Sequence, residues 1–126
     1  MTSPKPPADF AAPERALWRR SIEALEELGI WQPVDVDALE RYCRASAMSR
    51  LARERIAKRA KADPAGAFIA KGSMGQPVIA PDVELERRAR LDANALAREL
   101  GLTAAIRKRL SAQSDDLDDM LAEMTR

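Results

Sequence analysis

The sequence predicts a mainly α-helical protein with four helices and a small β-hairpin or extended loop between the second and third helices. Three observations predict it: helix-forming Ala, Leu, Arg and Glu recur throughout, only five of the 126 residues are aromatic, and glycine and proline divide the helical stretches. Few aromatic residues disfavour an all-β sandwich or barrel. Many of the hydrophobic residues are alanine, so the core of one chain is thin, and we expect some helix faces to be buried between subunits.

The N-terminal part consists of an arm and a first helix. Residues 1–12 are rich in proline, and we expect a disordered N-terminal arm or an extended one. The helix begins at Pro13, which lacks only an N–H that the first turn leaves unpaired. It ends at Gly29, after which we expect Ile30 and Trp31 to fold back onto it. Its apolar residues recur at three- and four-residue steps, which is typical of an amphipathic helix: Trp18, Ile22, Leu25 and Leu28.

A second, longer helix follows Pro33. Asp35 and Asp37 are candidate N-caps, and nothing breaks the helical pattern before Asp63, so we expect the helix to run to about Lys61. Its apolar residues form a heptad-like stripe: Val36, Leu39, Cys43, Ala47 and Leu51. A helix of this length in a small domain needs a partner along its side.

The remaining elements are a hairpin and two further helices. Short apolar segments flank a glycine-containing turn, which predicts a hairpin at about 67–80. A third helix follows Pro81 and ends at Gly101, and a short fourth helix begins at Thr103. We therefore expect a helical core over 13–110 and an acidic C-terminal tail over 111–126.

Charge is unevenly distributed although the net charge is only +1. Between Arg41 and Lys61 there are eight Lys or Arg residues and one acidic residue, Glu54. The C-terminal end reverses this balance with Asp115, Asp116, Asp118, Asp119 and Glu123. Such asymmetry indicates two different partners.

The basic run is the best candidate DNA-binding surface. On a helix one broad face would carry Arg41, Arg44, Arg55, Lys58 and Arg59. Arg50, Arg53 and Lys61 point elsewhere, and Arg50 lies near the apolar stripe, where we expect a subunit contact. A second candidate is Arg107, Lys108 and Arg109, which either contact DNA or complement the helix dipole. A solvated or salt-bridged face is the alternative interpretation of the basic run.

The acidic tail is a candidate docking segment for a protein partner. Leu117, Met120, Leu121 and Met124 recur at helical spacing between acidic residues, including Asp115, Asp116, Asp118 and Asp119. Clustered carboxylates repel phosphate, which places the tail outside the DNA surface. The alternative is that these residues pack within an assembly of the same chain.

Several function classes are disfavoured. The sequence has no histidine and a single cysteine, Cys43, so it lacks the commonest general base, the commonest metal ligand and an internal disulfide. Lys71-Gly72-Ser73 has the wrong upstream glycine spacing for a phosphate-binding loop. We expect no catalytic site, metal or cofactor. We also expect no membrane span or signal peptide, and hence an intracellular, soluble protein.

Taken in order, several segments carry a family resemblance. They are Leu28-Gly29-Ile30, the stretch 37–43, Glu86-Arg87-Arg88-Ala89 after Pro81, and Leu100-Gly101-Leu102-Thr103 with its basic continuation. Over about residues 13–110 the chain resembles the small terminase subunits of tailed phages and prophages. It departs from them at Ala104, Ala105 and Ile106, where the family often has proline, serine and a small polar residue.

The resemblance implies a non-catalytic helical subunit that forms an oligomeric ring. Such a subunit binds double-stranded viral DNA near the packaging start and recruits the large ATPase-nuclease subunit, in the cytoplasm of the host bacterium. Two other functions remain open from the sequence. One is a helix-turn-helix transcriptional regulator that reads DNA with its first two helices, and the other is a helical adaptor that does not bind DNA.

Overall fold

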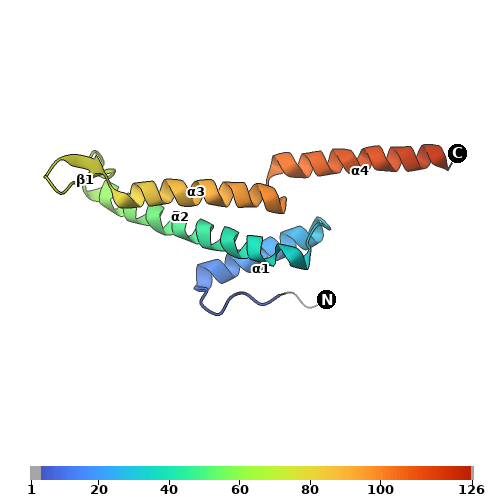
Figure 1. Ribbon diagram of the computed structural model, residues 1–126, viewed down its shortest axis with the longest axis horizontal. Helices are drawn as coiled ribbons and strands as arrows, with labels where there is room; N and C mark the ends of the chain where they lie inside the picture. The colour runs from blue at the N-terminus through green and yellow to red at the C-terminus, as the bar shows by residue number, and fades with distance from the viewer. Residues whose placement is uncertain (1–3, 126) are drawn as a thin grey trace.

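The computed structural model describes residues 4–125, including the side chains of residues 4–104 and 115–125. This part of the chain contains four α-helices and one two-stranded β-hairpin (Figure 1). In order, they are α1 (Ala12–Glu27), the 3-10 turn η1 (Pro33–Asp35), α2 (Val36–Ala62), β1 (Ile69–Lys71), β2 (Pro77–Ile79), α3 (Pro81–Leu100) and α4 (Ala104–Met124). The predicted helical class and the hairpin between the second and third helices are confirmed.

Helices α2 and α3 form a long antiparallel pair, because the hairpin returns the chain along α2 (Figure 1). Small buried side chains bring the two backbones close together: Ser49, Ala52, Ala89 and Ala93. Helix α1 packs against α2 on another side. The pair thus supplies the lateral partner that the length of α2 requires.

The hydrophobic core lies where α1 meets the beginning of α2 and the end of α3. Its buried members come from all three helices and the arm: Phe10, Trp18, Ile22, Leu39, Cys43 and Leu100. The predicted fold-back after Gly29 is confirmed, because the N–H groups of Ile30 and Trp31 donate to the carbonyl of Leu25 at 3.1 and 3.3 Å. Trp31 packs against the same core.

The predicted apolar stripe of α2 is correct only in its first turns. Leu39 and Cys43 are buried, but Leu51 is 51% exposed, and Ser49 and Ala52 are buried in its place. The predicted stripe was a single contact face over the first four turns of the helix. Instead α2 contacts α1 with one side near its N-terminus and α3 with another side further along, so the buried positions change register.

The described part of the N-terminal arm, residues 4–11, is extended and packed rather than disordered. The indole Nε1–H of Trp18 donates to the carbonyl of Pro4 at 3.2 Å. Phe10 is only 2% exposed, and its ring meets that of Trp18 edge to face at a centroid distance of 5.8 Å. Proline-rich composition predicts disorder, but burying one aromatic ring orders the segment.

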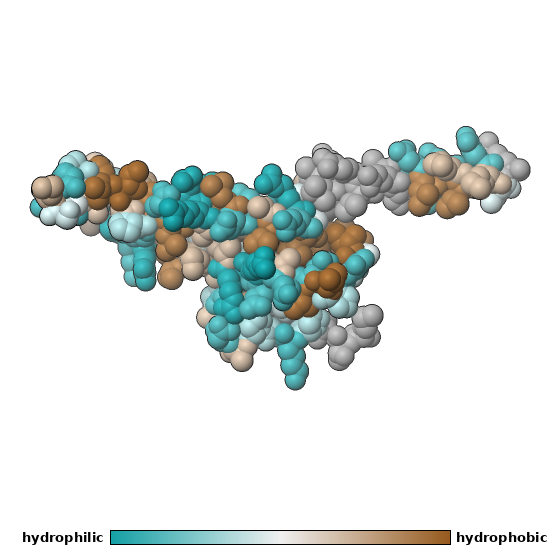
Figure 2. Space-filling model, viewed as in Figure 1, coloured by the Kyte–Doolittle hydropathy of each residue, from teal (hydrophilic) through white to brown (hydrophobic). Residues whose placement is uncertain are grey.

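The hairpin closes one end of the α2–α3 pair. Ile69 pairs with Ile79 and Lys71 with Pro77, and Gly75 has a left-handed φ of 77° in the turn. Ala67 and Ala80 are buried at its base, next to the helices. The outer side chains of the hairpin remain exposed, and they form the apolar patch at this end of the molecule in Figure 2.

Helix α4 is longer than predicted. Gly101 ends α3 in the left-handed conformation, with φ 83°, and the N–H of Leu102 donates to the carbonyl of Ala97 at 2.8 Å. The backbone then stays helical from Ala104 to Met124 without a break at Ser111, because no glycine or proline interrupts it. α4 extends away from the other helices, toward the end opposite the hairpin (Figure 1).

Candidate nucleic-acid interface

The predicted basic face of α2 is divided by intramolecular ion pairs. Arg41, Arg55 and Lys58 are exposed and have no ion pair with any described side chain. Arg44 and Arg59 are held by neighbouring carboxylates instead. The exposed face is therefore smaller than the sequence predicts, and the alternative of a salt-bridged face holds for two of its five members.

Arg44 connects the N-terminal arm to α2 through side-chain hydrogen bonds. Its guanidinium donates to both carboxylate oxygens of Asp9 at 3.0 Å and to Glu40 at 2.8 Å, and it lies 4.9 Å from the centroid of the Phe10 ring. These hydrogen bonds, chiefly the one to Asp9 and then the one to Glu40, raise the pKa of Arg44 above its usual range. Arg44 thus joins the arm to α2, and its positive charge is already paired with carboxylates.

Arg59 joins the end of α2 to the start of α3. It donates to both carboxylate oxygens of Asp82 and to the carbonyl of Ala67. The hydrogen bond from Arg59 holds the pKa of the Asp82 carboxyl below its ordinary value. The side chain of Asp82 is only 16% exposed, so this pair anchors the base of the hairpin.

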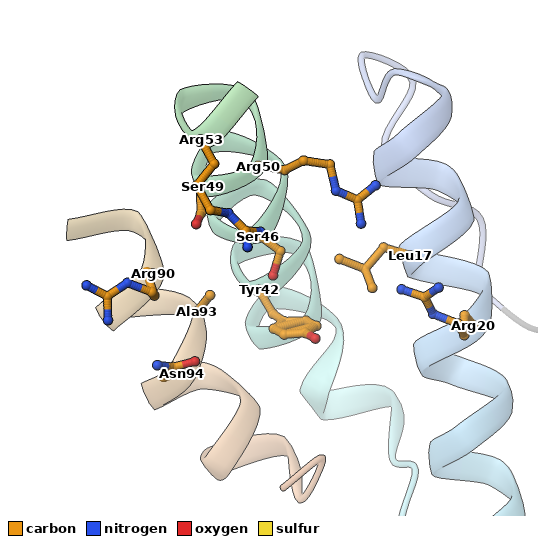
Figure 3. A pocket seen from close by; sticks show the side chains of 10 residues that line it. All are labelled: Leu17, Arg20, Tyr42, Ser46, Ser49, Arg50, Arg53, Arg90, Ala93 and Asn94. Carbon is orange, nitrogen blue, oxygen red and sulfur yellow. The ribbon is translucent and has the colours of Figure 1, made fainter. Parts of the chain in front are cut away.

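A cleft between α1, α2 and α3 gathers four arginines (Figure 3). It has a volume of about 330 Å³, and the side chains that line it are Leu17, Arg20, Tyr42, Ser46, Ser49, Arg50, Arg53, Arg90, Ala93 and Asn94. Arg20 on α1 and Arg50 on α2 reach into the gap between their two helices (Figure 3). A smaller hollow of about 70 Å³ shares Leu17, Arg20, Ser46 and Arg50, so the cleft continues along α1.

The arginine cleft has an excess of positive charge. No carboxylate lines it, and Arg20, Arg50 and Arg53 have no ion pair with any described side chain. Arg90 alone is paired, with Glu86 at 3.3 Å, and the same carboxylate oxygen accepts from Ser49 at 3.2 Å. Positive charges on neighbouring side chains repel one another, and an anion between them offsets this repulsion.

The lining groups suit a phosphate. Planar guanidinium groups donate paired hydrogen bonds that match phosphate oxygens. Tyr42, Ser46 and Asn94 add neutral hydrogen-bonding groups to the same cleft. Chemically, these groups can donate hydrogen bonds to the oxygens of a phosphodiester or a similar anion.

The sequence prediction missed this cleft. Arg20 and Arg90 carry no distinguishing pattern, Arg53 was expected to point away from the DNA face, and Arg50 was expected in a subunit contact. The four residues come together only because three helices pack as they do. No local pattern in the sequence predicts that arrangement.

A comparison with models of protein families shows to which family this chain belongs. The model of the family described as phage terminase, small subunit, matches residues 15–116, which is most of the chain. The chain belongs to this family. No curated protein and no solved structure matches the chain significantly.

The family match includes all four cleft arginines of this small terminase subunit, and it establishes a role in phage packaging. It also includes Arg107, Lys108 and Arg109, whose side chains lie outside the described residues. Among the described residues no cluster of acidic or cysteine side chains is arranged to hold a metal ion. None of the described helices is long and apolar enough to span a bilayer.

The end of α4 carries the predicted acidic and apolar residues on separate sides. Leu117, Met120, Leu121 and Met124 recur at three- and four-residue steps along one side and are between 52% and 79% exposed. Asp115 and Asp119 lie on the opposite side, whereas Asp116 and Asp118 flank the apolar stripe. Figure 2 shows the apolar residues as a patch near the C-terminus.

Proposed function

We propose that this small terminase subunit binds double-stranded viral DNA through the arginine cleft and acts as a non-catalytic component of the packaging motor. It assembles into an oligomeric ring in the cytoplasm of the host bacterium. The acidic side of α4 recruits the large ATPase-nuclease subunit. No cofactor takes part.

The observation that carries the DNA-binding proposal is the unbalanced charge of the arginine cleft. Four arginine side chains from three helices line a concave surface, and among the described side chains only Arg90 is paired with a carboxylate. A DNA backbone supplies the missing negative charge as a row of phosphates. Contacts of this kind position the protein on the duplex without reading its sequence.

The exposed basic face of α2 is the second candidate DNA surface. Arg41, Arg55 and Lys58 have no ion pair with any described side chain. Met48 and Leu51 lie between them on the same face and are 47% and 51% exposed. Apolar side chains at the middle of this face are poorly suited to a phosphate backbone. The arginine cleft is therefore the better candidate for the DNA-binding surface.

Matched charge reversals on α2 test the two surfaces. In the cleft variant Arg50→Glu/Arg53→Glu, duplex affinity falls at least about tenfold, because each charge-assisted hydrogen bond contributes about 1.5–3 kcal/mol. The control Arg41→Glu/Lys58→Glu changes the net charge equally on the other side of the same helix, outside the cleft, and binds within about twofold of wild type. Fluorescence anisotropy with a labelled duplex measures both.

The opposite ranking of the two variants would assign DNA binding to the exposed basic face. If neither variant changed affinity, DNA would bind elsewhere, and Arg107, Lys108 and Arg109 are the remaining candidate. Absence of duplex binding by the wild type would identify an adaptor that does not bind DNA. Native mass spectrometry separates the remaining alternative, since a helix-turn-helix regulator forms a dimer and a terminase ring contains more copies.

A further inference from the structure

The apolar side of α4 has no partner among the residues that the structure describes. Leu117, Met120, Leu121 and Met124 form this apolar stripe, and each is more than half exposed. α4 shares no extensive packing contact with another element of the described chain. An isolated helix with such a stripe is stable only when the stripe is buried.

A second apolar surface lies at the hairpin end. A groove of about 420 Å³ runs between the hairpin and the two long helices, and we call it the hairpin groove. Its apolar lining includes Ile69 and Leu85, which are 54% and 41% exposed. Arg55 lies at its rim with no described ion-pair partner, and the Arg59–Asp82 pair forms its floor.

The two surfaces lie at opposite ends of the molecule. Figure 1 places the hairpin at one end and the C-terminal end of α4 at the other, with the α2–α3 pair between them. Within the structure of one chain they do not meet. Contact between them requires a second copy and joins unlike patches, which is a heterologous interface.

We propose that the apolar stripe of α4 binds in the hairpin groove of a second copy of this chain. The charges of the two surfaces are complementary, because Asp116 and Asp118 flank the stripe and the unpaired Arg55 lies at the rim of the groove. Docking covers the exposed Leu and Met side chains and gives Arg55 a carboxylate partner.

This contact rests on the oligomeric part of the proposed function and specifies it. Each copy offers one stripe and one groove, so the contact repeats from copy to copy and closes into a ring when the rotation between neighbours allows. Asp115 and Asp119 stay on the outer side of α4 and remain available to the large subunit.

Thiol crosslinking tests the contact. The variant Ile69→Cys/Leu121→Cys has one new cysteine in the groove and one in the stripe, and a short bismaleimide joins them only where both surfaces meet. The native Cys43 does not interfere, because it is buried and burial raises the pKa of its thiol to about 12. On a denaturing gel the double variant gives a ladder of dimers, trimers and larger species.

The single variants are the controls. Ile69→Cys alone and Leu121→Cys alone stay monomeric on the gel, and a mixture of the two gives dimers but nothing larger. Dimers of Leu121→Cys alone would show that α4 pairs with α4. A double variant that crosslinks only within one chain would show that α4 folds back on its own groove, and no crosslink at all would assign the stripe to another protein. Each of these three outcomes overturns the proposal.

A second measurement does not depend on crosslinking. Leu117→Asp/Leu121→Asp places charges in the stripe and converts the oligomer to monomer in sedimentation velocity, whereas Asp115→Asn/Asp119→Asn on the opposite side leaves the oligomer intact. An oligomer that survives the first variant contradicts the proposal. DNA binding by the cleft variant is measured separately, so failure of this contact and failure of the DNA proposal are distinguishable.

Discussion

At the scale of single residues, the arginines of α2 have two different physical roles. Arg44 and Arg59 each donate to a bound carboxylate and hold other segments in place. Arg50 and Arg53 have no such partner and lie in the arginine cleft. Helical spacing alone does not distinguish these roles, because a carboxylate distant in sequence, such as Asp9 or Asp82, decides which arginine is neutralised.

The two phenylalanines of the chain provide a matched stability test. Phe10 is 2% exposed and packs against Trp18, whereas Phe68 is 54% exposed in the segment leading into the hairpin. Phe10→Ala lowers the free energy of unfolding by about 3 kcal/mol or more, as large-to-small core substitutions do. Phe68→Ala changes it by less than about 0.5 kcal/mol. Urea denaturation followed by circular dichroism measures both, and equal losses would contradict the packed arm.

At the scale of elements, α4 differs from the other helices because its described side chains, over residues 115–124, are exposed on every side. Its apolar side and its acidic side therefore serve different partners in the scheme proposed here. Sequence spacing predicted both residue types but assigned them to one partner. The helical geometry separates them, since residues two positions apart lie on different sides.

The acidic side of α4 is expected to bind the large terminase subunit. Asp115→Asn/Asp119→Asn removes two charges without changing side-chain size, so capture of the purified large subunit in a pull-down falls while duplex affinity is unchanged. The matched control is Asp37→Asn/Asp92→Asn, which removes the same charge from exposed positions on α2 and α3. Undiminished capture by the Asp115→Asn/Asp119→Asn protein would place the large-subunit contact elsewhere.

At the scale of the whole molecule, the arginine cleft, the hairpin groove and the free end of α4 occupy different parts of an elongated chain (Figure 1). The net charge of +1 conceals this separation. In the proposed ring each copy presents one cleft, so weak phosphate contacts from several copies would add along the same duplex.

The salt dependence of DNA binding reports how many copies contribute. Neutralising Arg50 and Arg53 to alanine reduces the slope of log affinity against log salt by about 0.9 for each lost phosphate contact. The slope is therefore reduced by about 2 when one copy contacts DNA, and by about 2 more for each further copy that contacts it. Anisotropy titrations at several salt concentrations measure the slope. An unchanged slope would show that these arginines do not contact phosphates.

The sequence by itself determined the helical class, the hairpin and the ends of most elements. Gly29, Gly101 and the prolines act locally, through backbone conformations and missing donors, so their effects are readable without a fold. The burial of Trp18 and the fold-back at Trp31 also followed from spacing. The family was recognisable because its landmarks occur in a fixed order along the chain.

Only the tertiary structure determined which charged residues form an ion pair with another described side chain and which do not. The register change in the buried side of α2 exposes Leu51, and packing of α1 and α3 around the same helix brings Arg20 and Arg90 to Arg50 and Arg53. These effects depend on which sides of the helices meet, and no single helix carries that information. Charge–charge interactions act through space between residues distant in sequence, so the arginine cleft appears only when the helices are packed together.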